Sequence, residues 1–167
     1  MNNLLIIGAG QHGRVVQEVA VRMKTFDRID FLDDASSDAV GKISDLKKFA
    51  SDYKNCFIAI GNNQIRSEIY EKARSLGYFF PAIIHPTAQI SPTAKIGEGT
   101  VIMHNCVINS EAVIQSCSII GIGSIIDHNS RIGHASHLKP GCIVDSNTEI
   151  PDFSLLPAGE IVRGTIK

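Results

Sequence analysis

A six-residue beat runs through the second half of the chain. From Ile84 to Val162 an aliphatic residue recurs at every sixth position without an insertion, which divides the segment into fourteen consecutive units. A small residue stands four places after the aliphatic one in all but the last two units. Neither the helical period nor the alternation of a simple strand produces this pattern. The small residues are Ala88, Ala94, Thr100, Cys106, Ala112, Ser118, Ser124, Ser130, Ser136, Cys142, Thr148 and Ser154.

A period of six residues is typical of a β-helix, in which short strands separated by turns stack their aliphatic residues into a continuous column. Each unit buries little surface alone, so the stack makes the core. If three units close one triangular coil, fourteen units give fewer than five coils, and the prism is about 22 Å tall at a strand spacing of about 4.8 Å. The small residue is expected inside, near a corner. The pattern fixes neither the number of units per coil nor the hand of winding.

The first eighty residues predict a separate α/β domain. Three short apolar runs are followed by glycine or acidic residues, and helical patterns stand between them, which indicates a small parallel sheet with flanking helices. We therefore divide the chain into residues 1–80 and residues 81–167. The expected strands are 4–7, 29–32 and 56–60, and the expected helices are 15–23, 44–53 with Ser44 as N-cap, and 64–76 with Gly77 as C-terminal stop.

The expected carboxyl ends of these strands carry groups suited to a nucleotide. Gly8-Ala9-Gly10-Gln11-His12-Gly13 follows a strand and precedes a helix, and the free N–H groups of a helix N-terminus favour a phosphate. Asp33 or Asp34 at the next strand end can bind ribose hydroxyls. Eighty residues lack the second half-sheet of a dinucleotide fold, so a nucleotide sugar fits better than NAD. The alternatives are a tight turn that needs positive φ and acids that cap or solvate a loop.

Composition narrows the function classes. The net charge is −1, with 16 basic and 17 acidic residues, which argues against nucleic-acid and anionic-membrane partners. No long apolar run or leader-like segment is seen, so the expected location is cytoplasmic. The four cysteines have no C-x-x-C spacing and two occupy the small-residue slot of the repeat, which predicts buried thiols instead of a disulfide or a zinc site.

The repeat resembles that of the hexapeptide-repeat acyltransferases, whose β-helices are left-handed and which usually work as trimers with active sites between subunits. Together with the stretches GAGQHG, FLDD and FIAIGNNQIR, it resembles the sugar O- and N-acetyltransferases of the bacillosamine and sialic-acid pathways. The bacillosamine branch, which acetylates a UDP-4-amino-4,6-dideoxy sugar, is the nearer match. This resemblance implies a homotrimer that uses acetyl-CoA as co-substrate and no metal. It also implies that the UDP-sugar is held by Gly10, Gln11, His12, Asp33, Asp34 and Gly61.

The family's active-site coil resembles two stretches of this chain, Ser124 to Asn129 and Ile132 to His137. The resemblance makes His128 the general base and His137 a contact of acetyl-CoA, while His104 and His134 are expected at the surface. Asn129 stands beside the base where the family usually has a carboxylate, with Asp127 on the other side. Gly121 aligns with an asparagine that faces the substrate in close relatives.

Acyl transfer from a thioester to a sugar amine or hydroxyl requires the acceptor to lose a proton as it attacks. Histidine side chains titrate near pH 6.5 in model peptides, so a neutral imidazole suits this role at pH 7. The leading hypothesis is an acetyl-CoA-dependent acetyltransferase acting on a nucleotide-linked sugar. The chain ends thirty residues after His137, at least one coil sooner than in these relatives. Two alternatives stay open, which are O-acetylation of a free sugar such as sialic acid, and a non-catalytic trimeric relative that binds nucleotide sugar without coenzyme.

Overall fold

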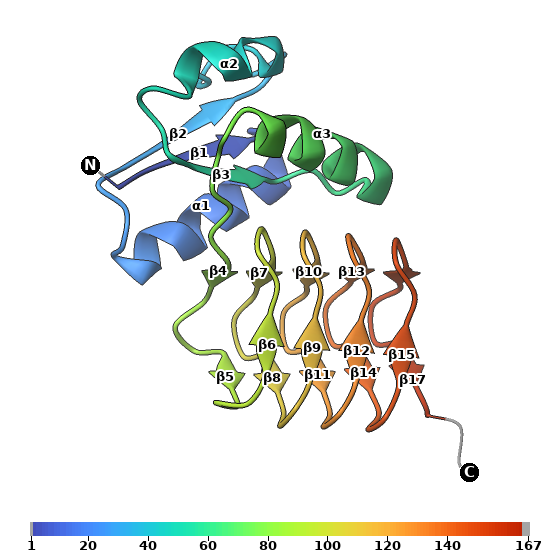
Figure 1. Ribbon diagram of the computed structural model, residues 1–167. Helices are drawn as coiled ribbons and strands as arrows, with labels where there is room; N and C mark the ends of the chain where they lie inside the picture. The colour runs from blue at the N-terminus through green and yellow to red at the C-terminus, as the bar shows by residue number, and fades with distance from the viewer. Residues whose placement is uncertain (1, 165–167) are drawn as a thin grey trace.

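The computed structural model describes residues 2–164. The repeat forms fourteen two-residue strands, β4 to β17, and each strand ends at the aliphatic residue of its unit. Each strand pairs in parallel with the strand three places further on, so three units form one coil of eighteen residues (Figure 1). The parallel β-helix after a small α/β domain is the predicted fold class. The strands are Ile83–Ile84, Gln89–Ile90, Lys95–Ile96, Val101–Ile102, Val107–Ile108, Val113–Ile114, Ile119–Ile120, Ile125–Ile126, Arg131–Ile132, His137–Leu138, Ile143–Val144, Glu149–Ile150, Leu155–Leu156 and Ile161–Val162.

The interior of the β-helix contains both the aliphatic column and the small residues, as predicted. From Ile102 to Ile150 the column residues are at most 3% exposed. From Thr100 to Ser136, the serine and threonine residues in this position donate hydrogen bonds to carbonyls fifteen residues further on, as in the 2.7 Å bond from Ser130 Oγ to the Asp145 oxygen. All four cysteines are buried and unpaired, and burial raises the pKa of each thiol. These thiols therefore contribute to packing and are poor nucleophiles.

The β-helix has three outer faces, named here by what lies on them. The covered face (β4, β7, β10, β13, β16) lies under the N-terminal domain. The polar face (β6, β9, β12, β15) carries an ion pair of 3.6 Å between Arg131 and Glu149. The aliphatic face (β5, β8, β11, β14, β17) has a row of outward apolar side chains, of which Val107 is 39%, Ile125 40% and Ile161 51% exposed.

The N-terminal domain is a three-stranded parallel sheet with order β2-β1-β3 (Arg28–Leu32, Asn3–Ile7, Asn55–Ile58). Alternate side chains of β1 enter two cores. Leu4 and Ile6 pack toward α1 (Gln11–Met23), whereas Leu5 and Ile7 pack in the core that contains residues of α2 (Leu46–Phe49) and α3 (Asn63–Ser75). The sheet is thus covered on both sides, as expected for parallel strands.

Helix α1 lies against the covered face (Figure 1). Val16, Val19 and Ala20 belong to the same buried cluster as the outward residues Ile83 and Val101 of that face. Ile83 and Val101 point outward from the β-helix, but both side chains are fully buried under α1. The N-terminal domain and the β-helix therefore share one apolar core.

The segment from residue 44 to residue 53 differs from its prediction. A short 3₁₀ turn, Ile43–Asp45, precedes the four-residue α2, and Ser44 lies inside that turn instead of capping a helix. The carboxylate of Asp45 accepts the backbone N–H of Lys42 at 3.1 Å, so the acid one residue later does the capping. Among the described residues, no helix is long and apolar enough to cross a membrane.

Candidate active site

The glycine-rich turn after β1, the acids after β2 and the loop after β3 meet at one edge of the sheet, as predicted. We call this edge, formed by residues 8–13, 33–34 and 61–62, the nucleotide-facing edge after the ligand expected there from the sequence. Gly8 has φ of +102°, and a Cβ on Gly13 would lie 2.0 Å from the Gly8 oxygen, so helix α1 can start this close to β1 only with glycine at both positions. Gly10 is the N-cap of α1 and makes no side-chain capping bond. The first turn of α1 therefore has backbone N–H groups that no side-chain cap satisfies.

Both acids at this edge organise their own loop. Asp33 accepts N–H groups from Ala9 at 2.8 Å, Ala35 at 2.8 Å and Ser36 at 2.9 Å, and these bonds lower the pKa of its carboxyl group. Asp34 accepts the N–H of Ile43 at 3.0 Å. Asp33 therefore caps its own loop, which is the alternative role considered from the sequence. Its Oδ2 bond to Ala9 also joins the glycine-rich turn to the end of β2.

His12 points from α1 toward the β-helix. Its ring centroid is 6.4 Å from that of His137, and its Nε2 atom is buried without a hydrogen-bond partner. Burial, together with the nearby His137 and Arg66, lowers the pKa of His12 to about 4. At pH 7 its imidazole is therefore neutral, and it can interact with a ligand as a hydrogen-bonding group, not as a cation.

The lowered pKa of His12 predicts acid sensitivity of the seam between the two domains. Because the unfolded state binds a proton below pH 6.5 and the folded state only near pH 4, stability falls as the pH drops through this window. The expected loss of unfolding free energy between pH 7 and pH 4 is about 3 kcal/mol from this residue. Chemical denaturation should show that the free energy of unfolding falls less steeply with decreasing pH for His12→Gln than for the wild type. Equal slopes would contradict the assignment.

His137 lies on the covered face, at the start of β13, and not beside His128. Burial and the positive charge of Arg66 lower the pKa of His137, and a hydrogen bond with the backbone of Gly61 partly opposes this shift. The structure thus brings His137 to the loop after β3 and to His12. This places the predicted coenzyme contact next to the nucleotide-facing edge.

His128 lies at the corner after β11, between the aliphatic face and the polar face. Its Nδ1 atom is 2.9 Å from Nδ2 of Asn129, and its backbone N–H donates to Asp127 at 2.7 Å. Asp127 also accepts from Asn109 at 2.9 Å, and these two bonds lower the pKa of the Asp127 carboxyl group. The corner is therefore fixed by side-chain hydrogen bonds around the imidazole.

This corner is opposite the covered face. The N-terminal domain packs on β4, β7 and β10, on the side of the β-helix away from the corner between β11 and β12 that carries His128. Figure 1 shows the N-terminal domain above the covered face. The His128 corner and the nucleotide-facing edge of one chain therefore do not form one continuous site.

Gly121 leaves no room for a side chain. A Cβ at this position would lie 2.6 Å from the Leu138 oxygen and 2.7 Å from the Pro140 nitrogen. Backbone atoms at these distances cannot be displaced cheaply. The asparagine that aligns here in close relatives therefore has no equivalent in this coil.

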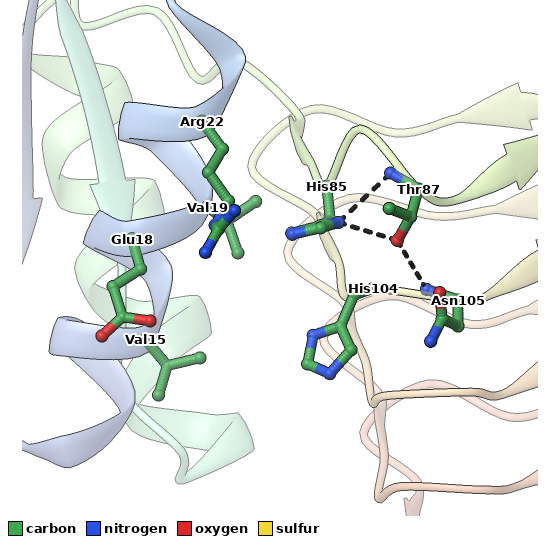
Figure 2. Close-up of a pocket in the computed structure, with 8 residues that line it drawn as sticks. All are labelled: Val15, Glu18, Val19, Arg22, His85, Thr87, His104 and Asn105. Carbon is green, nitrogen blue, oxygen red and sulfur yellow. Dashed lines mark hydrogen bonds between the residues drawn. The ribbon is translucent and has the colours of Figure 1, made fainter.

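A groove of about 320 Å³ separates α1 from the corner between the covered face and the aliphatic face. Figure 2 shows Glu18 and Arg22 of α1 across the groove from His85 and His104. The two imidazoles contact edge to face, with 5.3 Å between ring centroids. His104 is thus a groove-lining residue near the surface.

Among residues 2–164, no group of three or more His, Cys, Asp or Glu side chains could hold a metal ion.

Residues of α3 that the sequence did not single out join the two domains. His134, expected at the surface, is instead partly buried and lies 2.8 Å from both Ser67 Oγ and Ser116 Oγ, so that expectation is wrong. Arg66 is 1% exposed. Asn63 donates to the oxygens of Phe153 at 2.8 Å and Ser154 at 3.0 Å. Asn63 and Arg66 both lie in the FIAIGNNQIR stretch, which was the one available signal.

Comparison with known proteins extends over both domains. Residues 3–73 match the family model of the PglD N-terminal domain. The acetyltransferase domain of PglB from Neisseria gonorrhoeae FA1090, in complex with acetyl coenzyme A, is 34% identical with a TM-score of 0.94, and the match covers 98% of this chain and 83% of that one. PerB from Caulobacter crescentus, in complex with CoA and GDP-perosamine, is 29% identical with a TM-score of 0.80 over 98% and 89% of the two chains.

The match to PglB covers nearly the whole of this chain, and the family model matches its N-terminal domain. The chain belongs to the family of hexapeptide-repeat sugar acetyltransferases, which carry a PglD-type N-terminal domain before the β-helix.

Proposed function

We propose that this protein transfers the acetyl group of acetyl-CoA to the amine of a nucleotide-linked sugar, with His128 as general base. The observation that carries the proposal is the outward imidazole at a hydrogen-bonded corner of the β-helix. It occurs in a chain that also has a glycine-rich turn before a helix, a feature suited to binding a phosphate. The relative PerB, 29% identical, was crystallised with CoA and GDP-perosamine, which supports the same class of substrates here.

In the proposed reaction, Nε2 of His128 removes a proton from the sugar nitrogen as that nitrogen attacks the thioester carbonyl. The new C–N bond forms, the C–S bond breaks, and coenzyme A leaves as a thiolate. A positioned base of this kind contributes roughly 10²–10⁴-fold to the rate. The four cysteines are buried, so the acetyl group passes directly to the sugar without an enzyme-bound thioester.

Asn129 determines which nitrogen of His128 can act as the base. When its Nδ2 donates to Nδ1 of His128, as in the present amide orientation, the ring proton resides on Nε2. Base function requires the amide to turn by half a rotation, so that Oδ1 accepts from Nδ1–H and the lone pair of Nε2 is free. This rotation keeps the shape of the side chain.

Asn129→Asp provides a test of this role. The introduced carboxylate can only accept from Nδ1–H and stabilises the imidazolium by charge, so the acidic limb of the kcat/KM profile should move to higher pH. The stronger base should raise the plateau of kcat by about threefold. Asn147→Asp, at the same left-handed corner position one coil further on, is the matched control for added charge. An unchanged profile for Asn129→Asp would argue that Asn129 does not hold the base.

We further propose that the protein is a homotrimer built on the aliphatic face. This face is a row of half-exposed Val107, Ile125 and Ile161 side chains, whereas the other two faces are charged or already covered. Association through this row would remove the apolar surface from water. It would also place the His128 corner of one chain beside the covered-face corner and α1 of its neighbour, which solves the separation of base and substrate edge.

In this assembly we assign the substrate contacts to the nucleotide-facing edge. N–H groups at Gly10, Gln11 and His12 would receive the phosphates, and Asp34, with only one described hydrogen bond, is better placed than Asp33 to accept from ribose hydroxyls. Gly61 would approach the sugar closely, because a side chain there would project into open space. For His137 the proposal is a contact to the acetyl or pantetheine part of the coenzyme, from its place beside Gly61.

The direct experiment is to incubate the protein with acetyl-CoA and UDP- or GDP-linked amino sugars and to measure thiol release. Turnover with a nucleotide sugar, together with nucleotide binding in calorimetry, supports the proposal. Turnover with a free sugar such as sialic acid and no nucleotide binding favours the free-sugar alternative. Nucleotide-sugar binding without acetyl-CoA binding or thiol release identifies a non-catalytic relative.

A further inference from the structure

Arg66 of α3 is a buried cation whose guanidinium donates hydrogen bonds only to amide oxygen atoms of the backbone and of an asparagine side chain. Its guanidinium donates to the oxygens of Cys117 at 2.7 Å, Ala135 at 2.7 Å, Ile60 at 2.8 Å and Gly61 at 3.2 Å. It also donates to Oδ1 of Asn63 at 2.9 Å. No carboxylate in the described part of the chain forms a salt bridge with it. The residue is therefore not one half of an ion pair, and its desolvation is offset only by these bonds.

The two β-helix oxygens that Arg66 binds belong to a special position of the coil. Cys117 and Ala135 have φ of +60° and +50° at corners between the polar face and the covered face. The ladder of backbone hydrogen bonds uses the carbonyls on either side of this position, those of Ser116 and Ser118 at the first corner, and does not include the carbonyls of Cys117 and Ala135. At an exposed corner water would serve them. Here Cys117 is 1% and Ala135 0% exposed, so they need a protein donor.

The other two oxygens, those of Ile60 and Gly61, belong to the loop after β3 on the nucleotide-facing edge. One planar group thus ties this edge to two successive coils of the β-helix. Its five N–H donors diverge from a fixed plane, so they set direction as well as distance. The apolar contact of α1 fixes the domain on its other side, but apolar contact is not directional.

We propose that Arg66 is a positioning residue, which fixes the nucleotide-facing edge at one height along the β-helix so that a bound sugar reaches the reacting groups. The inference rests on the proposed function. In the proposed trimer the β-helices position the reacting groups, so the nucleotide-facing edge must have a fixed position relative to its own β-helix. A displacement of about 1 Å in such a site can cost about 100-fold in rate. Asn63, which binds the carbonyl of Phe153 at the next corner, supports the same register.

Arg66→Lys tests the proposal, since it keeps the charge and the aliphatic stem but cannot donate to both domains at once. We expect kcat to fall 10- to 100-fold well below the unfolding temperature, with the KM for acetyl-CoA and the calorimetric Kd for nucleotide within twofold of wild type. Asn63→Ala should show the same split with a smaller loss. The matched control is Arg74→Lys, an exposed arginine of the same helix that is 4.0 Å from Glu71.

A second measurement does not depend on turnover. Spin labels at Lys47 in the N-terminal domain and Glu149 on the polar face, both exposed, report the distance between the two domains in mixtures diluted with unlabelled chain. A broader or shifted distance distribution in Arg66→Lys supports the proposal. A wild-type distribution with wild-type kcat overturns it, as does a lower melting temperature alone. If no nucleotide sugar is acetylated by the wild type, the proposed function fails and the distance measurement still decides whether Arg66 sets the register.

Discussion

Replacing His128 by alanine should lower kcat by roughly 10²–10⁴-fold at pH 7, which is the contribution of a positioned general base. The fold should not change, because the imidazole stands outside the core and its Nδ1 contacts only the neighbouring Asn129. The KM for acetyl-CoA should stay close to wild type, since proton removal is needed in the transition state and not for coenzyme binding. Steady-state thiol release with a nucleotide-linked amino sugar measures both constants.

Lys95→Ala is the control for this substitution. Lys95 is exposed on the polar face, two coils before the His128 corner and away from the groove beside α1. We expect it to keep kcat within about threefold of wild type, the range of surface substitutions away from special features. Equal activity of His128→Ala and the wild type would show that His128 is not the general base, although the fold would be unaffected by this result.

Ile125→Glu should abolish both the trimer and turnover. Ile125 lies in the middle of the aliphatic face, and a carboxylate buried there without a partner costs several kcal/mol in each of three interfaces. The chain itself should fold, because the side chain points away from the core and is 40% exposed. Sedimentation and thermal unfolding report the two properties separately. Lys95→Glu on the polar face is the control, and it should leave mass and rate unchanged.

Mixed trimers give a sharper test of the shared site. Gly10→Phe should block the nucleotide-facing edge without unfolding it, because a Cβ at Gly10 meets no atom within 4 Å. Neither this variant nor His128→Ala should be active alone. If base and substrate edge come from different chains, trimers assembled from both variants regain some intact sites. Failure of the mixture to recover activity, with mixed trimers demonstrated by mass, would place the whole site in one chain.

The fold was largely predictable because the hexapeptide period determines both local structure and pairing. The same aliphatic residue ends the strand, fills the column and sets the register with the strand eighteen residues away. The short α2 was not predictable from spacing. Tyr53 is buried and its hydroxyl donates to Asp30 of β2 at 2.6 Å, an anchor that depends on where the segment crosses the sheet.

The site was predictable only where a motif carries its own geometry. The glycine-rich turn met the strand ends because parallel strands bring their carboxyl ends to one edge. The partners of His134 and Arg66 could not be read from the sequence, because they depend on α3 lying along one corner of the β-helix. The separation of His128 from the nucleotide-facing edge has the same origin, since no spacing in the chain encodes which face the N-terminal domain covers.

The bonds from small interior side chains to carbonyls fifteen residues on have an evolutionary consequence. Each bond joins one coil only to the next, as from Ser118 to Gly133 and from Ser136 to Pro151. A stretch of eighteen residues can therefore be gained or lost beyond Leu138 without rethreading the coils that precede it. The coil that carries His128 can therefore keep its structure while the far end of the β-helix is lengthened or shortened.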